Sequence, residues 1–190
     1  RRVTLVPAHE VVDQLQPLSA GVIEVRPLGG YSPVDVDARR IRRIVSNLVG
    51  NAIEHGEGRT IVVSIDSNAS AVAISVRDWG IGMTANDVDH VFDRFWRADP
   101  SRKRTLGGTG LGLAIAQEDA AVHGGTVEAW SRPGEGSNFR LTLPRSEGIT
   151  TFMSPLPLIP DDVVVEGGDP QATGGWLRRP FRRTRREKRR

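Results

Sequence analysis

The chain of 190 residues contains no cysteine and no long uninterrupted run of hydrophobic residues. Without cysteine it has no disulfide bonds and no thiolate metal site, which fits a reducing compartment. No hydrophobic run approaches the roughly 20 residues that a membrane-spanning helix needs. The opening segment RRVTLVPAHEVV also lacks the hydrophobic core of a signal peptide. We therefore expect a soluble, cytoplasmic chain with one ordinary globular core.

Aromatic residues are scarce, at 5% of the chain, and positive charge is unevenly distributed. Residues 178–190 hold nine of the 26 basic residues and one of the 23 acidic ones, so the rest of the chain is net acidic. The high isoelectric point therefore belongs to this tail and does not indicate that the folded part binds nucleic acid. The tail also lacks the series of aromatic residues on which single-stranded nucleic acid stacks, so we predict no nucleic-acid partner.

The composition of the chain changes near residue 145. Before this point helix and strand signals alternate, and after it come SPLPLIPDD, the Gly- and Pro-rich EGGDPQATGG and the basic run. Such compositions are typical of linkers rather than of packed elements. We predict a domain over 1–145 and a disordered linker with an Arg-rich tail over 146–190.

Hydrophobic periodicity predicts alternating helices and strands within the domain. The strongest helix signal spans 38–55, where hydrophobic residues recur at helical spacing and Gly56 follows. A helix is also expected from Pro7 onward and another over 110–123. Strands are expected at 3–6, 22–26, 34–36, 60–66, 71–77, 126–131 and 137–143. The predicted fold class is a two-layer α/β sandwich, a mixed sheet with about three helices on one face.

The predicted helix 38–55 carries polar residues beside its hydrophobic face. Asn47, Asn51 and either Glu54 or His55 are spaced so that they form one stripe along the helix. Asparagine is a mediocre helix former, so two stacked amides beside a core suggest a ligand that needs oxygen donors. Mg²⁺ with a nucleotide phosphate is one such ligand. The alternative is a solvated helix edge.

The segment RDWGIGM at 77–83 ends a predicted strand in an acid and then breaks into glycines. Gly80 and Gly82 allow backbone to approach a ligand closely, and Asp78 is placed to accept a hydrogen bond from an exocyclic amine. The letters GIGMTA match the dinucleotide-binding fingerprint. That fingerprint follows a strand of continuous hydrophobic residues, whereas the predicted strand here alternates between hydrophobic and small or polar residues. An ordinary glycine turn is the alternative.

Two further segments combine positive charge with glycine. In VFDRFWRAD at 91–99 the aromatic residues are expected to pack on the core, leaving Arg94 and Arg97 free to reach a phosphate. In GGTGLGLAIAQ at 107–117, glycines lead directly into a helix, which favours an anion cradle made of backbone amides. No Lys-Ser/Thr pair follows these glycines, so the segment is not a Walker P-loop. The basic, aperiodic stretch 97–106 is expected to form a lid.

The order of these four segments resembles the N, G1, F and G2 boxes of the histidine-kinase branch of the gyrase, heat-shock-protein, kinase and mismatch-repair ATPases. The resemblance covers roughly 1–145. It implies the Bergerat ATP-binding fold with a flexible ATP lid, and the cofactors ATP and Mg²⁺. It also implies a protein histidine kinase activity, in which ATP donates its γ-phosphate to a histidine on a separate dimerisation domain and a response regulator then takes the phosphate.

The resemblance also implies roles for individual residues. Asn51 would coordinate Mg²⁺ with help from Asn47, and Asp78 would bind the adenine amino group. Arg94 and Arg97 would stand near the lid and the γ-phosphate. The other residues implied to contact the nucleotide are His55, Gly80, Gly82, Met83, Gly108, Thr109, Gly110, Leu111 and Gly112. Many family members carry Lys or Arg where this chain has Glu54, so the role of that position differs here.

We expect this chain to contain the ATP-binding half of the kinase without its acceptor histidine. His9 and Glu10 begin like the acceptor motif His-Glu-x-x-x-Pro, but position 14 is Gln, so we reject them. We expect a monomer, the cytoplasmic domain of a membrane-anchored kinase, whose tail meets an anionic membrane surface or is simply solvated. Two rival functions are a self-contained ATPase, disfavoured because Asn47 replaces its catalytic Glu, and a regulatory nucleotide switch.

Overall fold

The computed structural model describes residues 2–3, 6–29, 33–96, 110–146 and 148–164. Contacts divide the chain into a compact unit, Arg1–Pro160, and a second unit, Asp161–Arg190. The predicted lid over 97–106 and the whole basic tail at 178–190 lie outside the described residues. No helix in the described part of the chain is long and hydrophobic enough to cross a membrane.

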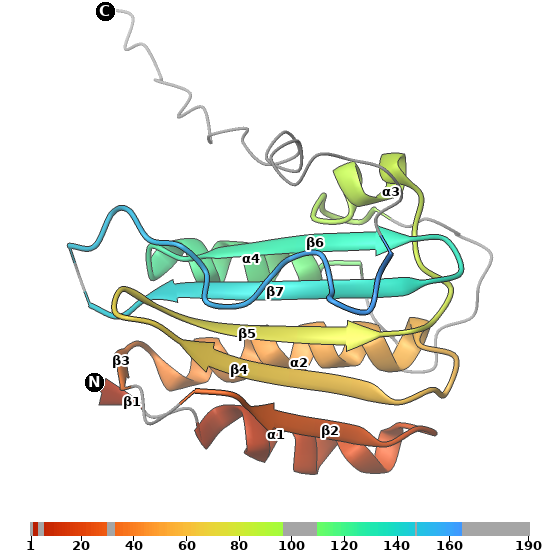
Figure 1. Cartoon of the computed structure of the whole chain (residues 1–190), viewed down its shortest axis with the longest axis horizontal. Helices are drawn as coiled ribbons and strands as arrows, with labels where there is room; N and C mark the ends of the chain where they lie inside the picture. The colour runs from red at the N-terminus through yellow and green to blue at the C-terminus, as the bar shows by residue number, and fades with distance from the viewer. Residues whose placement is uncertain (1, 4–5, 30–32, 97–109, 147, 165–190) are drawn as a thin grey trace, which may run out of the picture. The chain divides into compact units, whose positions relative to one another are not determined.

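The compact unit is built on a five-stranded sheet with the strand order β2-β4-β5-β7-β6 (Figure 1). The pair β2–β4 is parallel and the other three pairs are antiparallel, so the sheet is mixed as predicted. Strands β1 and β3 form a separate antiparallel pair. The strands are β1 Arg2–Val3, β2 Ile23–Pro27, β3 Val34–Asp35, β4 Ile61–Ser67, β5 Ala71–Asp78, β6 Thr126–Arg132 and β7 Gly136–Pro144.

Helices α1, α2 and α4 cover one face of this sheet, while the short helix α3 lies near one end of it (Figure 1). Their bounds, with one 3-10 turn, are α1 Val6–Leu15, η1 Gln16–Leu18, α2 Ala38–His55, α3 Ala85–His90 and α4 Gly112–Val122. The three long helices on one face confirm the predicted layering. Helix α3 was not predicted, although Thr84 and Asp87 form a capping box at its start.

Local sequence explains helix α2. The side chain of Asp37 accepts a hydrogen bond from the backbone N–H of Arg39 and caps the N-terminus, and the helix ends before Gly56. One face is buried against the sheet and against α1 and α4, which confirms the prediction over 38–55. The buried residues are Ile41, Ile44, Val45, Leu48, Val49 and Ala52.

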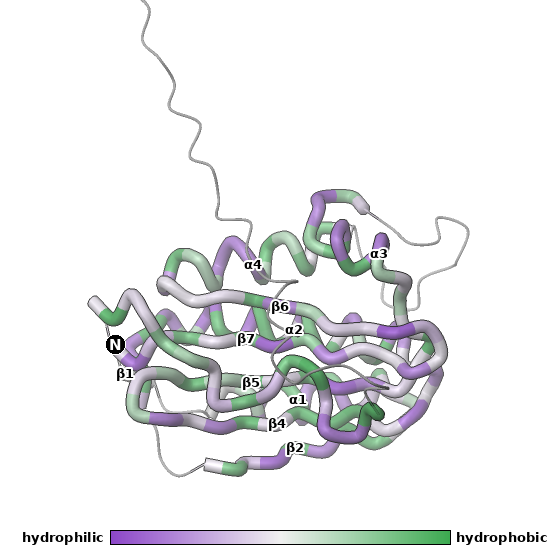
Figure 2. Tube along the Cα trace, turned by 45° about the horizontal axis from the view of Figure 1, so that its top comes forward, coloured by the Kyte–Doolittle hydropathy of each residue, from purple (hydrophilic) through white to green (hydrophobic). Residues whose placement is uncertain are grey.

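The core lies between the helices and the inner face of the sheet. Alternate residues of the central strands contribute to it, and each fully buried Val, Ile, Leu or Phe stabilises the fold by about 1.5–3 kcal/mol. Along helix α4 a hydrophilic band separates two hydrophobic turns (Figure 2). The sheet residues in the core include Val63, Ile65, Val72, Ile74, Val76, Phe139 and Leu141.

The outer face of the sheet carries a segment that follows the predicted domain 1–145. By its contacts, residues 148–160 belong to the compact unit. In Figure 1 this segment runs along the face of the sheet opposite the helices. It has no regular secondary structure, because its prolines cannot donate to a strand ladder, and it is held instead by side chains of the sheet.

Candidate functional site

The polar stripe of α2 lies against the beginning of α4. A Cβ added at Gly112 would come within 3.1 Å of the side-chain oxygen of Asn47, so the glycine permits this close approach. The side-chain nitrogen of Asn47 is buried and has no hydrogen-bond partner among the described residues. A buried polar group without a partner costs about 1–3 kcal/mol, which indicates a place for a ligand. Two segments 65 positions apart in sequence therefore meet at one point.

An ion-pair cluster joins the same two helices, α2 and α4, at a second place. Both carboxylate oxygens of Asp119 on α4 are bound by arginines of α2, with Arg40 Nη1 and Arg43 Nε each at 2.6 Å. Asp119 is 2% exposed. Burial favours its neutral form, but the hydrogen bonds from Arg43 and Arg40 outweigh it and hold the pKa of Asp119 below its usual value. Sequence reasoning missed this cluster.

Asp78 ends strand β5 and is buried, with 1% of the residue exposed. Its Oδ1 accepts a hydrogen bond of 2.9 Å from the backbone N–H of Gly80, while its Oδ2 is buried without a partner among the described residues. Burial raises the pKa of Asp78 to about 6, against the backbone amides of Gly80 and Ser137 and the charge of Arg77. At neutral pH the group is therefore mostly a carboxylate with one acceptor oxygen open to a donor.

Glycines bring the loop after Asp78 against the end of helix α2. A Cβ at Gly80 would overlap the carbonyl oxygen of His55, which also accepts a hydrogen bond of 3.2 Å from the N–H of Ile81. Gly82 has a φ of +65°, and a Cβ there would overlap the carbonyl oxygen of Arg132. The loop after Asp78 therefore packs against the end of α2, at His55 and Gly56.

Other predicted residues lie around this loop. Met83 packs partly buried against the core, and its N–H donates to the hydroxyl of Ser131 at 2.8 Å. Asn51, Glu54 and His55 are half-buried on the last turns of α2. The side-chain oxygen of Asn51 is the type of neutral donor that Mg²⁺ accepts when it keeps water and phosphate ligands. Among the described residues no group of three or more His, Cys, Asp and Glu side chains forms a metal site.

The segment after α3 reaches back to the start of α4. The N–H of Phe95 donates to the carbonyl oxygen of Gly110 at 3.0 Å, and Gly110 has a φ of +76°. Phe95 itself has a φ of +63° and is 70% exposed, an uncommon conformation for a bulky residue that marks local strain. Arg94 pairs with Glu118 of α4 at 2.5 Å. Both side chains are exposed, so the pair is weak enough to exchange for another anion.

Among the described residues, no side chain caps the N-terminus of α4, where Leu111 occupies the capping position. Amides at the start of a helix are a common binding place for anions. Gly110, Leu111 and Gly112 lie at the start of the helix, and Gly112 is next to Asn47. Arg97, Gly108 and Thr109 were also predicted to take part, and they lie outside the described residues.

Comparison with known proteins gives consistent results. The family model described as "Histidine kinase-, DNA gyrase B-, and HSP90-like ATPase" matches residues 36–147. The sensor histidine kinase MtrB of Mycobacterium tuberculosis is 52% identical over 126 residues, which cover 66% of this chain and 22% of that protein. The sensor histidine kinase WalK of Bacillus subtilis is 45% identical over 117 residues, which cover 60% of this chain and 19% of WalK. The chain therefore spans about a fifth of the length of these relatives.

Solved structures share the fold. The mycobacterial sensor histidine kinase MprB aligns with a TM-score of 0.65 and 22% identity, covering 76% of this chain and 96% of that one. The catalytic domain of the histidine kinase ThkA aligns with a TM-score of 0.65 and 22% identity, covering 77% and 99%. These alignments confirm the predicted two-layer fold.

Proposed function

The chain belongs to the histidine kinase-, DNA gyrase B- and HSP90-like ATPase family, and we propose that it is the ATP-binding catalytic domain of a two-component sensor histidine kinase. The observation that carries the proposal is the buried carboxylate of Asp78. One of its oxygens has no partner among the described residues, beside a glycine loop that packs on the end of α2. An adenine amino group would supply the missing donor, beside the loop that Gly80 and Gly82 allow to pack against the carbonyl oxygens of His55 and Arg132.

The phosphates would extend from this base toward the start of α4. Asn51 and Asn47 lie on the α2 stripe between Asp78 and Gly112, so a nucleotide bound at Asp78 would carry its phosphates along them. Asn51 would hold Mg²⁺ through its side-chain oxygen, and the metal would neutralise charge on the phosphates. The uncapped amides of α4, with Thr109, Gly108 and the other glycines of that segment, would bind the phosphate oxygens.

In the proposed reaction this chain positions ATP and does not itself accept the phosphate. The γ-phosphoryl group would pass in line to a histidine nitrogen of a separate dimerisation domain, with ADP as the leaving group, and then to a response regulator. Arg94 would leave its exposed pair with Glu118 and, together with Arg97, stabilise the transferring charge. In the full-length kinase the chain would be the cytoplasmic part of a membrane-anchored protein, and by itself a monomer.

The rival functions predict different products. A gyrase-like ATPase needs a general base for water, and position 47, where that Glu would stand, is Asn with a buried amide. A regulatory switch would bind ATP without transferring phosphate to any domain. Neither explains why Phe95 of the F segment donates a hydrogen bond to Gly110, directly before the start of α4.

A transfer assay tests the proposal. The chain is incubated with γ-labelled ATP and Mg²⁺, with and without the helical-hairpin domain of its parent kinase. Label is expected on the hairpin histidine only, in an acid-labile and alkali-stable bond, and is expected to disappear with Asn51→Ala. Rapid ATP hydrolysis by the chain alone would favour the gyrase-like ATPase, and ATP binding without transfer would favour the switch.

The Arg-rich tail has a separate proposed partner. Nine basic residues within 178–190 would attract an anionic membrane surface, at about 1 kcal/mol for each residue near the surface at low salt. Co-sedimentation with anionic vesicles, comparing the full chain with a chain that ends at residue 164, tests this. Equal binding of the two chains at every salt concentration would leave a solvated tail as the answer.

A further inference from the structure

The outer face of the sheet contains a buried arginine directly behind Asp78. Arg77, Asn138 and Trp130 form a row across three strands, because Asn138 of β7 is the ladder partner of both other residues. Arg77 is only 6% exposed, and its guanidinium lies 5.3 Å from the ring centroid of Trp130 and 4.8 Å from that of Trp79. A buried, stacked cation on a sheet face that carries no helix requires an explanation.

Arg77 holds the strand end that carries Asp78. Its Nη1 donates to the carbonyl oxygen of Asp78 at 2.7 Å and to that of Ser137 at 3.3 Å. Asp78 and Ser137 are ladder partners, so one guanidinium bridges the last pair of β5 and β7. Side chains alternate along a strand, which puts Arg77 on the outer face and the carboxylate of Asp78 on the inner one. Arg77 therefore fixes the backbone of Asp78 from behind.

The segment 148–160, here called the strap, lies over the same face. Arg140 Nη1 donates to the carbonyl oxygen of Leu156 at 2.6 Å, and Asn138 Nδ2 donates to that of Leu158 at 2.8 Å. Because position 156 meets 140 and position 158 meets 138, the strap runs antiparallel to β7. The second contact is to the same Asn138 that stands between Arg77 and Trp130 in the row.

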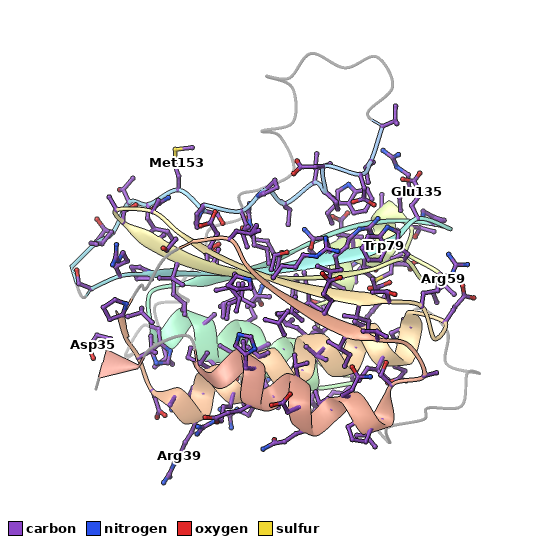
Figure 3. All side chains as sticks on the ribbon, turned by 60° about the horizontal axis from the view of Figure 1, so that its bottom comes forward. Asp35, Arg39, Arg59, Trp79, Glu135 and Met153 are labelled. Carbon is purple, nitrogen blue, oxygen red and sulfur yellow. The ribbon has the colours of Figure 1, made fainter. Side chains whose placement is uncertain are left out.

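The strap is also anchored at its start and by a buried side chain. Asn68 Nδ2, in the β4–β5 turn, donates to the carbonyl oxygen of Met153 at 2.9 Å. Leu156 is 5% exposed, whereas Met153 is 81% exposed and points away from the sheet (Figure 3). Prolines at positions 155, 157 and 160 restrict the free chain, which lowers the entropy lost on docking.

We propose that the strap is a positioning element of the nucleotide site: by docking along β7 it covers the row of Arg77, Asn138 and Trp130 and keeps the guanidinium of Arg77 on the carbonyl oxygens of Asp78 and Ser137. The strap lies beyond the 36–147 region that matches the family model. Arg77 acts here as a positioning residue, because it reaches the nucleotide only through Asp78. The inference rests on the proposed role of Asp78 in binding ATP.

Two substitutions within the strap of the full chain test the inference. Leu156→Asp places a charge at the buried anchor and is expected to release the strap, which limited proteolysis within 148–160 would detect. Met153→Asp makes the same change at an exposed position of the same segment and is the matched control. We expect Leu156→Asp to weaken ATP binding about fivefold in calorimetry and Met153→Asp to leave it unchanged.

A double-mutant cycle separates positioning from general loss of stability. Arg77→Lys keeps the charge but loses the planar guanidinium that lies over Trp79 and Trp130, so alone it is expected to weaken ATP binding about as much as Leu156→Asp. If the strap acts through Arg77, the two changes together cost little more than either one. Additive effects would overturn the inference. If Leu156→Asp does not fold, Asn138→Ala removes the second anchor and is expected to give the same non-additivity with Arg77→Lys.

The same experiments distinguish failure of this inference from failure of the proposed function. If Asp78→Asn leaves ATP binding unchanged, the proposed function is wrong and the inference falls with it. If Asp78→Asn weakens binding, but a chain whose strap is cleaved by protease binds ATP as tightly as the control, the inference alone is wrong.

Discussion

Two buried aspartates in this domain have opposite environments. Asp119 is 2% exposed and has both oxygens bound by Arg40 and Arg43, which keeps its pKa low. Asp78 is 1% exposed and has one oxygen bound by the N–H of Gly80 and one without a partner in the described part of the chain, and its pKa is raised to about 6. Both side chains are almost inaccessible to solvent, but desolvation dominates at Asp78, whereas the arginine hydrogen bonds outweigh it at Asp119. A buried carboxylate with both oxygens hydrogen-bonded, here called completed, holds two helices together. One with an oxygen left without a partner, here called incomplete, indicates a ligand.

The comparison predicts that the completed carboxylate contributes most to stability. Asp119→Asn removes the charge that three short arginine hydrogen bonds share, and we expect the free energy of unfolding to fall by about 2 kcal/mol. The estimate is moderate because both arginines are partly exposed and regain water. Urea denaturation measures it. Glu118→Gln, which alters only an exposed ion pair on the next residue, is the control and is expected to change stability little.

The incomplete carboxylate is predicted to contribute to binding instead. Asp78→Asn is nearly isosteric and removes a buried charge, so the fold is expected to remain and the chain without ligand to be no less stable. ATP binding is expected to weaken at least tenfold, about 1.4 kcal/mol, because the amide has no negative charge and replaces one acceptor oxygen with an NH₂ donor. Calorimetric titration with a circular dichroism control measures both quantities. Unchanged ATP affinity in a normally folded variant would contradict the assignment of Asp78.

The two aspartates are also predicted to titrate with opposite effects on stability. The pKa of Asp119 is lower folded than unfolded, so its contribution is present above its usual value of 3.8 and is lost as pH falls below it. The pKa of Asp78 is higher folded than unfolded, so its contribution falls as pH rises from 3.8 to about 6. In the Asp78→Asn variant, stability is therefore expected to depend less on pH between 4 and 6 than in the parent chain.

ATP affinity is expected to follow the same titration. Below about pH 6 Asp78 becomes protonated and loses its charge, which weakens its hydrogen bond to an amine donor. The parent chain should therefore lose affinity for ATP between pH 7 and pH 5 by several-fold more than Asp78→Asn does. Parallel pH profiles for the two chains would show that another group controls the dependence.

The smallest effect is expected at a third acid, Glu54, on the same helix as Asn51. Glu54→Ala is predicted to be nearly silent in ATP binding or to improve it slightly by removing repulsion of phosphate, whereas Asn51→Ala is predicted to abolish the Mg²⁺-dependent part. Titrations with and without Mg²⁺ compare the two variants. If Glu54→Ala were the more damaging change, our interpretation of the stripe on α2 would be wrong.

Local sequence predicted those elements whose signal is contained in the element itself. Helix 38–55 was predicted with its observed bounds, because the periodicity of Ile41 to Ala52 and the stop at Gly56 need no distant partner. Helix α3 was missed, although Thr84 and Asp87 form a capping box at its start, because six residues are too few to show a hydrophobic periodicity. The strap was missed for a different reason. Its prolines exclude a strand or a helix, and nothing within 148–160 reveals that Asn138 and Arg140 bind its carbonyl oxygens.

The candidate site divides in the same way. The order of Asn47, Asp78 and the glycine segments is a property of the sequence, since glycine and amide positions are readable one by one, and it led to the family that the comparison confirms. Tertiary structure decided how close these residues lie to one another. It also decided that Asp119 pairs with arginines 76 and 79 positions earlier, and that Arg77 hydrogen-bonds the ends of two strands. The physical reason is that the type of a residue determines which chemical groups it can bind. Its burial, and the presence or absence of a partner from another element, determine whether that binding capacity is used within the protein or remains for a ligand.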